Sequence, residues 1–430
     1  MSVPWGENDG LHPIGAVLYA LSRGSSATIR RHQISRLASF ALASGSRSIR
    51  LCQMLFVGLQ ARCLAALLST AVLFVSFSTQ ALGYGPIGHQ IVGAIADKKL
   101  AHTSTGARVA ELLDGFTLEQ VSVIADEIKG WDKRGADDPT IFHYSAHPRI
   151  DAQLRDFWRA NQPTHDSKSA MPSHHWFHYT DVPVLDPEKY ADGKTGRSSW
   201  DLVHMIQFCI AVLTGEQSAD NARKITKPIA IILLTHYVGD MHQPLHVGAE
   251  YFDAQGRAVN PDKGTPGFED EGGNTLVLQL ATPDVNPRRA RKLHGFWDND
   301  AVLANLPQLP DAMPKEERRA RMDAAKSELV GRLAAQEPKD WRLPAGVSLH
   351  DYAEAWANDI LPLAREAHAR LQFDHVAAWQ EEDRTVAAGN AVEKPSADHV
   401  SYEVWAARAV GLELQKAGWR LADLLEKTVR

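Results

Sequence analysis

Cysteine is scarce in this 430-residue sequence, and its few cysteines are unevenly placed. Cys52 and Cys63 lie near the N-terminus, and Cys209 is the single cysteine after residue 83. Residues 84–430 therefore cannot form an intramolecular disulfide, even in an oxidising compartment. We expect a bound metal, rather than disulfides, to cross-link this part of the chain.

An excess of positive charge is also lacking. The first 83 residues hold seven Lys or Arg and two acidic residues, so the remainder holds 39 basic and 50 acidic residues, a formal net charge of −11. A basic nucleic-acid-binding surface is therefore not indicated. An anionic substrate would have to be held locally, by metal charge or by a few placed cations.

The longest apolar run is short for a membrane span. Leu64 to Ser78 covers about 15 residues, where a span needs about 20. Arg62 before the run and Ala81-Leu82-Gly83 after it are typical of a signal peptide cleaved before Tyr84. We expect a secreted or periplasmic protein; the alternative is a retained membrane anchor.

A leader of 83 residues would be unusually long, which bears on how the chain is divided. Met54 would give a leader of ordinary length. We therefore interpret residues 1–53 as an upstream or mis-annotated extension, 54–83 as the signal peptide and 84–430 as one catalytic domain.

Repeats and low-complexity tracts are absent, and 44% hydrophobic with 23% charged residues fits a globular protein. Hydrophobic spacing predicts a mainly helical domain. A strand is expected at Thr275–Leu280, in a small β-hairpin, and residues 247–273 are expected to form a long functional loop. The predicted helices are 88–113, 118–131, 200–213, 222–239, 315–335, 347–371 and 402–427.

The most informative segment runs from His236 to His246 (HYVGDMHQPLH). It follows the apolar run Ile229–Leu234, so His236 and Asp240 should share one face of a buried helix. Gln243-Pro244 should end that helix and turn His246 towards the same spot. Imidazole and carboxylate ligands suit zinc, although a single buried His is more often a core residue than a ligand. His242 is a possible fourth ligand.

Five further motifs precede or follow this segment. They are YGPIGH (residues 84–89), IADEI (124–128), WFHYTD (176–181), GGN (272–274) and HGFWD (294–298). In this order the six motifs, with residues 352–369, resemble the S1/P1 nuclease family of secreted zinc-dependent nucleases. The resemblance runs from residue 84 to about 375 and implies the helical fold shared by phospholipase C and P1 nuclease.

The resemblance implies a cluster of three zinc ions. Asp126, His178, His236 and Asp240 would hold one ion, and His246, His294 and Asp298 a second. The third ion would be held by His89, by Asp240 as a bridge, and by the α-amino nitrogen and carbonyl oxygen of Tyr84. The family usually has Trp where this chain has Tyr84, but these ligand atoms belong to the backbone. His242 is not part of the implied set.

The resemblance also implies which residues act on the substrate. Asp126, Lys129 and Asp240 would be catalytic, with Lys129 close to the developing charge; a solvated surface Lys is the alternative. Tyr179 would stack on a base, while Asp181 and the Gly272-Gly273-Asn274 segment would bind it. Glu271 departs from the family, since the fungal members have an apolar residue there that closes the base pocket.

The implied activity is hydrolysis of single-stranded DNA and RNA to 5′-phosphorylated products by metal-bound hydroxide, together with 3′-nucleotidase activity on nucleotides. The alternatives are a zinc-dependent phospholipase C and a non-catalytic zinc-binding protein. No sequence feature indicates a stable protein partner, and membrane contact is expected only through an uncleaved leader.

Overall fold

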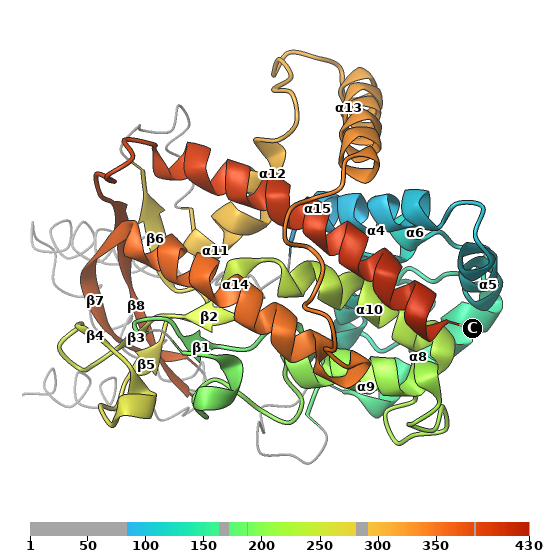
Figure 1. Cartoon of the computed structure of the whole chain (residues 1–430), viewed down its shortest axis with the longest axis horizontal. Coiled ribbons are helices and arrows are strands. Elements are labelled where there is room, and N and C mark those ends of the chain that lie inside the picture. The colour runs from blue at the N-terminus through green and yellow to red at the C-terminus, as the bar shows by residue number, and fades with distance from the viewer. Residues whose placement is uncertain (1–83, 163–171, 187, 281–290, 382–383, 430) are drawn as a thin grey trace, which may run out of the picture. The chain divides into compact units, whose positions relative to one another are not determined.

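The computed structural model describes residues 84–162, 172–186, 188–280, 291–381 and 384–429. These residues fall within one compact unit, Thr79–Arg430. Long helices dominate it and the sheets are small, which confirms the expected mainly α class (Figure 1). The proposed extension and leader, residues 1–83, lie outside the described residues.

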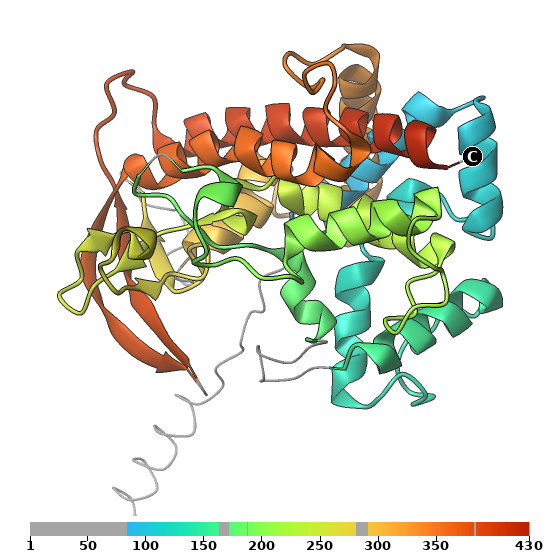
Figure 2. The same cartoon turned by 60° about the horizontal axis from the view of Figure 1, so that its bottom comes forward.

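Helix α10 (Lys227–Met241) occupies the centre of this unit. Every residue from Pro228 to Met241 is buried, as expected for a helix that is apolar around its whole circumference. The Thr226 hydroxyl caps its N-terminus by accepting from the Ile229 amide. Helices α4, α8, α9, α14 and α15 all contact α10 (Figures 1 and 2).

Two of the predicted helices are broken into shorter pieces. The expected helix 88–113 is α4 (Pro86–Leu100) followed by α5 (Ser104–Leu112), because His102 adopts a φ of 66° and the Thr103 side chain caps α5. The expected helix 118–131 is α6 (Leu118–Val121), α7 (Ile124–Glu127) and the 3-10 turn η1 (Ile128–Lys133). Asp126 and Lys129 lie on these short turns.

The other predicted helices lie close to their expected positions. The charged helix α13 (Lys315–Ala335) matches its predicted bounds. It buries Leu329, Val330 and Ala334 and contacts α4 and α15. The structure also contains α8 (Pro148–Ala160), α11 (Leu293–Gly295) and α12 (Ala301–Leu303); the remaining long helices are α9 (Leu202–Thr214), α14 (Tyr352–Ala369) and α15 (Tyr402–Thr428).

The expected strand at Thr275–Leu280 is present as β6 (Leu276–Gln279), and an antiparallel bridge joins its Val277 to Lys292. Strand β6 pairs in parallel with β8 (Arg384–Glu393), and β8 forms a long antiparallel hairpin with β7 (Leu371–Glu381). The hairpin therefore lies about a hundred residues after β6. No helix of the described residues is long and apolar enough to cross a membrane.

The expected loop 247–273 contains four short strands. β2 (Gly248–Ala249) pairs in parallel with β1 (Val182–Pro183), close to the ends of the two motifs that contain His178 and His246. β3 (Tyr251–Phe252) pairs with β4 (Ala258–Val259) and β5 (Phe268–Glu269) in an antiparallel sheet. These strands fix the residues just before Gly272.

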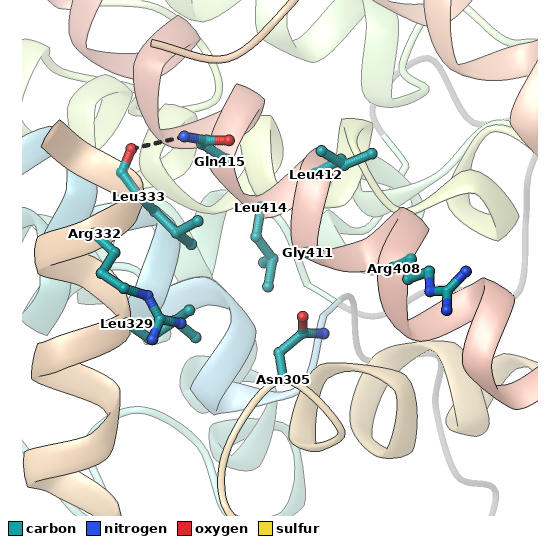
Figure 3. Close-up of a pocket in the computed structure, with 9 residues that line it drawn as sticks. All are labelled: Asn305, Leu329, Arg332, Leu333, Arg408, Gly411, Leu412, Leu414 and Gln415. Atoms are coloured by element: carbon teal, nitrogen blue, oxygen red, sulfur yellow. Dashed lines mark hydrogen bonds between the residues drawn. The ribbon is translucent and has the colours of Figure 1, made fainter. Parts of the chain in front are cut away.

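A cavity of about 350 Å³ lies between α13 and α15 (Figure 3). Its lining includes Asn305, Leu329, Leu333 and Leu412. None of the sequence-predicted site residues lines this cavity.

Candidate metal centre

Helix α10 supplies the first two candidate ligands. His236 and Asp240 are fully buried, and His236 Nε2 lies 3.3 Å from Asp240 Oδ2. The helix ends at Met241, and the turn η4 (Pro244–His246) brings His246 Nδ1 to 3.9 Å from Asp240 Oδ1. The proline-induced turn expected from the sequence is therefore present.

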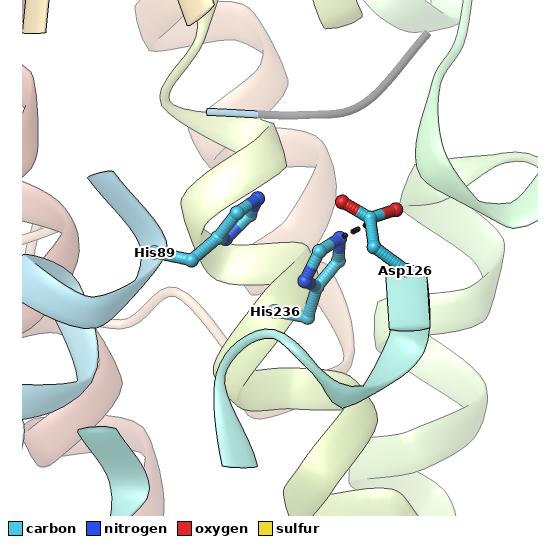
Figure 4. Close-up of side chains that lie close together, drawn as sticks. All are labelled: His89, Asp126 and His236. Carbon is cyan, nitrogen blue, oxygen red and sulfur yellow. Dashed lines mark ion pairs between the residues drawn. The ribbon is translucent and has the colours of Figure 1, made fainter. Parts of the chain in front are cut away.

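Three other segments bring side chains to the same place. His178 Nδ1, from the 3-10 turn η2 (His174–His178), lies 3.1 Å from Asp240 Oδ2. Asp126 Oδ1 lies 3.6 Å from His236 Nε2. His89 Nε2 lies 3.3 Å from Asp240 Oδ1, and its ring stacks on that of His236 at 3.8 Å between centroids. Figure 4 shows His89, Asp126 and His236 converging from α4, α7 and α10.

A second group adjoins the first. His294 and Asp298 lie four residues apart on α11 and the following turn η6 (Phe296–Asp300), with His294 Nε2 3.4 Å from Asp298 Oδ2. His246 Nε2 lies 3.0 Å from His294 Nε2. The Gln243 amide donates to Asp298 Oδ1 at 2.8 Å. We call the two groups together the ligand cluster: His89, Asp126, His178, His236, Asp240, His246, His294 and Asp298.

Backbone carbonyls set the tautomers of three imidazoles. The Nδ1 atoms of His236, His246 and His294 lie 2.6, 2.7 and 2.8 Å from the carbonyls of Ser122, His178 and Gly272. Each Nδ1 must donate there, which leaves an Nε2 lone pair directed into the cluster. The lone pairs of His246 and His294 then face each other at 3.0 Å. This arrangement is unfavourable unless a cation lies between them, and it is the orientation that metal-ligating histidines require.

Burial also shapes the charge of the cluster. Burial lowers the pKa of His89 to about 4 and that of His178 and His246 well below the usual value, so these imidazoles are neutral at neutral pH. Burial raises the pKa of Asp240 to about 7. Within the described residues, Asp240 Oδ1 and both nitrogens of His89 have no hydrogen-bond partner. Neutral imidazoles and unpaired carboxylate oxygen form a donor set that fits zinc.

Two glycines allow the close approaches in the cluster. A Cβ at Gly239 would lie 2.6 Å from His89 Nδ1, so any side chain at this helical position would displace that imidazole. Gly272 has a φ of +57°, and a Cβ there would lie 2.1 Å from the Leu245 carbonyl. Gly272 thus serves the metal centre by presenting its carbonyl to His294.

Tyr84 is completely buried beside the cluster. Its hydroxyl donates to the His242 carbonyl at 2.6 Å, and the neighbouring Gly85 amide donates to the Asp298 carbonyl at 2.8 Å. The Tyr ring is therefore well accommodated where the family usually has Trp. The His242 ring faces away from the ligand cluster, since its Nδ1 bonds the Val238 carbonyl and its Nε2 contacts Arg420.

Lys129 is 7% exposed, which excludes the alternative of a solvated surface lysine. Its ammonium donates to Asp126 Oδ1 at 2.8 Å. Burial opposes ionisation of Asp126, but the charge of Lys129 and its hydrogen bond to this carboxyl outweigh burial and lower the pKa of Asp126. Lys129 thus places a cation at the edge of the ligand cluster.

The residues expected to bind a base lie in an acidic environment. Burial and the carboxylates of Glu269, Asp270 and Glu271 raise the pKa of Asp181 well above its usual value. The Asn274 amide donates to the Glu271 carbonyl at 3.0 Å. The Tyr179 and Trp176 rings are 6.3 Å apart. We call this region the base pocket: Trp176, Tyr179, Asp181, Glu269, Asp270, Glu271, Asn274 and Arg384.

Arg384 is the residue of this pocket that sequence reasoning missed. It begins β8, forms ion pairs with Glu271 and, at 3.5 Å, with Glu269, and lies 6.0 Å from the Trp176 ring centroid. Glu271 is therefore held in an ion pair with Arg384. Arg384 lies on a hairpin strand more than a hundred residues after Glu271, and no local signal in the sequence links these two residues.

The structure defines a mainly helical protein with a buried His and Asp site that could hold metal ions, and comparison with known proteins identifies the family. The S1/P1 Nuclease family profile matches residues 84–430. This match covers most of the chain, so the chain belongs to the S1/P1 nuclease family.

Individual relatives are more distant. Endonuclease 2 of Arabidopsis thaliana is 22% identical over 232 residues, which are 51% of this chain and 56% of that protein. Endonuclease 4 of the same plant is 26% identical over 145 residues, 31% of this chain and 40% of that protein. Endonuclease 1 is 32% identical over 92 residues, 21% of this chain and 22% of that protein. The chain thus spans at most 56% of the length of these relatives.

Proposed function

We propose that this protein is a secreted zinc-dependent endonuclease. It hydrolyses phosphodiester bonds of single-stranded DNA and RNA to 5′-phosphorylated products and also acts as a 3′-nucleotidase. The main support, in a chain of this family, is the orientation of His246 and His294. The Nδ1 atom of each ring bonds a backbone carbonyl, so the two Nε2 lone pairs face each other.

Three zinc ions would be distributed over the ligand cluster. Asp126, His178, His236 and Asp240 would hold the first, and His246, His294 and Asp298 the second. The third would be held by His89, the second oxygen of Asp240 and the backbone of Tyr84. When bound, such ions activate water near neutral pH and neutralise charge on a phosphate.

The chain's own residues position the substrate. The Lys129 ammonium, held at 2.8 Å by Asp126, stabilises negative charge that develops on phosphate as the P–O3′ bond breaks. Tyr179 stacks on an unpaired base, a contact worth about 1–3 kcal/mol whichever base is present. Asp181, whose carboxyl can stay protonated in its buried acidic surroundings, offers both a donor and an acceptor to the base edge, with Asn274 beside it.

The acidic net charge agrees with this proposal. A polyanion would be repelled by a protein with net charge −11 in residues 84–430, unless cations are concentrated at the site. Divalent ions in the ligand cluster, Lys129 and Arg384 provide that local charge.

We further propose that residues 54–83 are a cleaved leader and that residues 1–53 are an extension. Mass spectrometry of the exported product tests this proposal by identifying its N-terminal residue.

The test of the proposed function is turnover by the purified, zinc-loaded protein on single-stranded DNA, RNA, a 3′-nucleotide and phosphatidylcholine. We expect hydrolysis of the first three and 5′-phosphate ends on the products, with full loss after chelation and recovery with zinc. Turnover of phosphatidylcholine alone would identify a phospholipase C instead. A zinc-saturated protein that hydrolyses none of them would be a non-catalytic zinc-binding protein and would refute the proposal.

A further inference from the structure

A third group of potential metal ligands lies outside the ligand cluster. Asp132 belongs to η1, and His174 and His175 begin η2. One ligand atom from each of the three residues lies within 4.8 Å of the other two. Asp132 precedes His174 and His175 by about 40 positions in the sequence, so the fold, rather than local spacing, brings the three residues together.

His174 provides the clearest sign of a missing partner. Its side chain is 1% exposed, and within the described residues its Nε2 has no hydrogen-bond partner. That nitrogen faces Asp132 Oδ1 at 3.9 Å, which is too long for a hydrogen bond. Two ligands of one tetrahedral zinc lie roughly 3.3 Å apart, so a shared ion needs only a small adjustment of this spacing.

The other two ligands are oriented for the same ion. His175 Nε2 lies 2.5 Å from Asp132 Oδ2, and the buried Trp158 of α8 donates to Asp132 Oδ1 at 2.7 Å. An indole donor that fixes a carboxylate is the outer support that metal ligands commonly have. The side chains of Asp132 and His175 are 16% and 20% exposed, so an ion can reach the site from solvent.

The electrostatic state of His174 suits a ligand. Burial lowers its pKa to about 4, so the imidazole is neutral and its ring nitrogen can offer a lone pair at neutral pH. Two imidazoles with one carboxylate are a donor set that suits zinc and similar transition metals.

We propose that Asp132, His174 and His175 bind a further divalent transition-metal ion of the zinc type, separate from the ligand cluster. The ion joins η1, which directly follows Asp126 and contains Lys129, to η2, which ends in His178. It acts as a structural clip between the two segments in a part of the chain that has a single cysteine. The inference does not depend on the proposed nuclease activity.

The direct test is a crystal of the protein as purified, with an anomalous difference map at the zinc edge. We expect a peak in bonding contact with Asp132 Oδ2, His174 Nε2 and His175 Nε2. A peak that appears only after soaking in millimolar zinc, or no peak at all, would overturn the inference. Peaks at the ligand cluster with none at Asp132, His174 and His175 would refute this inference and leave the proposed function intact. A peak at these three residues with none at the ligand cluster would support this inference and contradict the proposed three-zinc cluster.

Metal content of variants gives a second, independent test. His174→Gln and His175→Gln should each lose one zinc per chain relative to the unmodified protein, and the increase in Tm on adding zinc should shrink. His204→Gln is the matched control, because His204 pairs with Asp201 at 3.0 Å but belongs to no group of three ligands. Unchanged zinc content in a folded His175→Gln protein contradicts the proposal. The partly exposed His175 makes that variant informative even if His174→Gln does not fold.

Discussion

The ligand cluster is buried and the base pocket is partly buried, and the carboxylates of the two regions are neutralised in different ways. In the ligand cluster, imidazole lone pairs and carboxylate oxygens face one another, and under the proposed function bound metal ions supply most of the positive charge. In the base pocket, Arg384 supplies it to Glu269 and Glu271, while His368 lies 3.2 Å from Asp270. Under the proposed function, the ligand cluster therefore depends on bound ions, whereas the base pocket contains a cation of its own, Arg384.

The largest effect is expected from Asp240→Asn, which tests whether the ligand cluster depends on bound ions. Asp240 contacts His89 with one oxygen and His178 with the other, so the change should remove the ions on both sides. We expect activity to fall by more than about 100-fold, the upper range for residues that only orient a ligand. Hydrolysis rates and zinc content measure the effect. Asp220→Asn, at an exposed carboxylate, is the control; full activity in Asp240→Asn would contradict the bridging role.

A pair of glycine variants separates packing around the cluster from general helix propensity. Gly239→Ala should destabilise the protein by about 1–3 kcal/mol, because the new methyl group displaces His89. Gly331→Ala, in α13 with nothing within 4 Å, should instead stabilise it by roughly 0.5–1 kcal/mol. Denaturant unfolding measures both, and zinc content should fall only in the first. Equal effects would mean that the cluster does not require this close approach.

Arg384→Ala tests whether the base pocket depends on its own cation. Removing the guanidinium leaves Glu269 and Glu271 to repel a polyanion, so KM for single-stranded DNA should rise about tenfold, or about 1.4 kcal/mol. We expect kcat to change little, since the ligand cluster is untouched. Adding Glu271→Gln should restore part of the loss. Arg319→Ala, 85% exposed, is the control, and an unchanged KM in Arg384→Ala would show that the pocket does not need this charge.

The last expected effect depends on pH and concerns the stability contributed by His368. Burial lowers its pKa, but the hydrogen bond and charge of Asp270 outweigh burial and raise it above the usual 6.5. The pair therefore stabilises the fold fully below pH 6.5, and its contribution is lost as the pH rises through the folded-state pKa. His368→Gln should cost about 1.5–3 kcal/mol at pH 6 and less at pH 9. Unfolding free energies at the two pH values measure this, and a pH-independent loss would argue against a charged pair.

The two regions also differ in how far the sequence predicts them. His236, Asp240 and His246 could be assigned because helical spacing and a proline turn are local effects, and the structure brings all three together. Arg384 could not, because its position depends on the parallel pairing of β6 with β8, which joins segments about a hundred residues apart. The break at His102 was missed for a related reason, since the hydrophobic pattern continues through a turn that one left-handed residue creates.

Helices α4 and α15 pack directly against each other, with Gly418 so close to Ile95 that a Cβ would lie 2.5 Å away. About 300 residues separate the two helices along the chain, so this contact is strongly non-local. Because α4 carries His89, the docked α15 supports the helix that presents this candidate ligand to the cluster. All eight residues of the ligand cluster precede residue 300, so a chain that ends before α15 holds every candidate ligand but lacks the helix that supports α4.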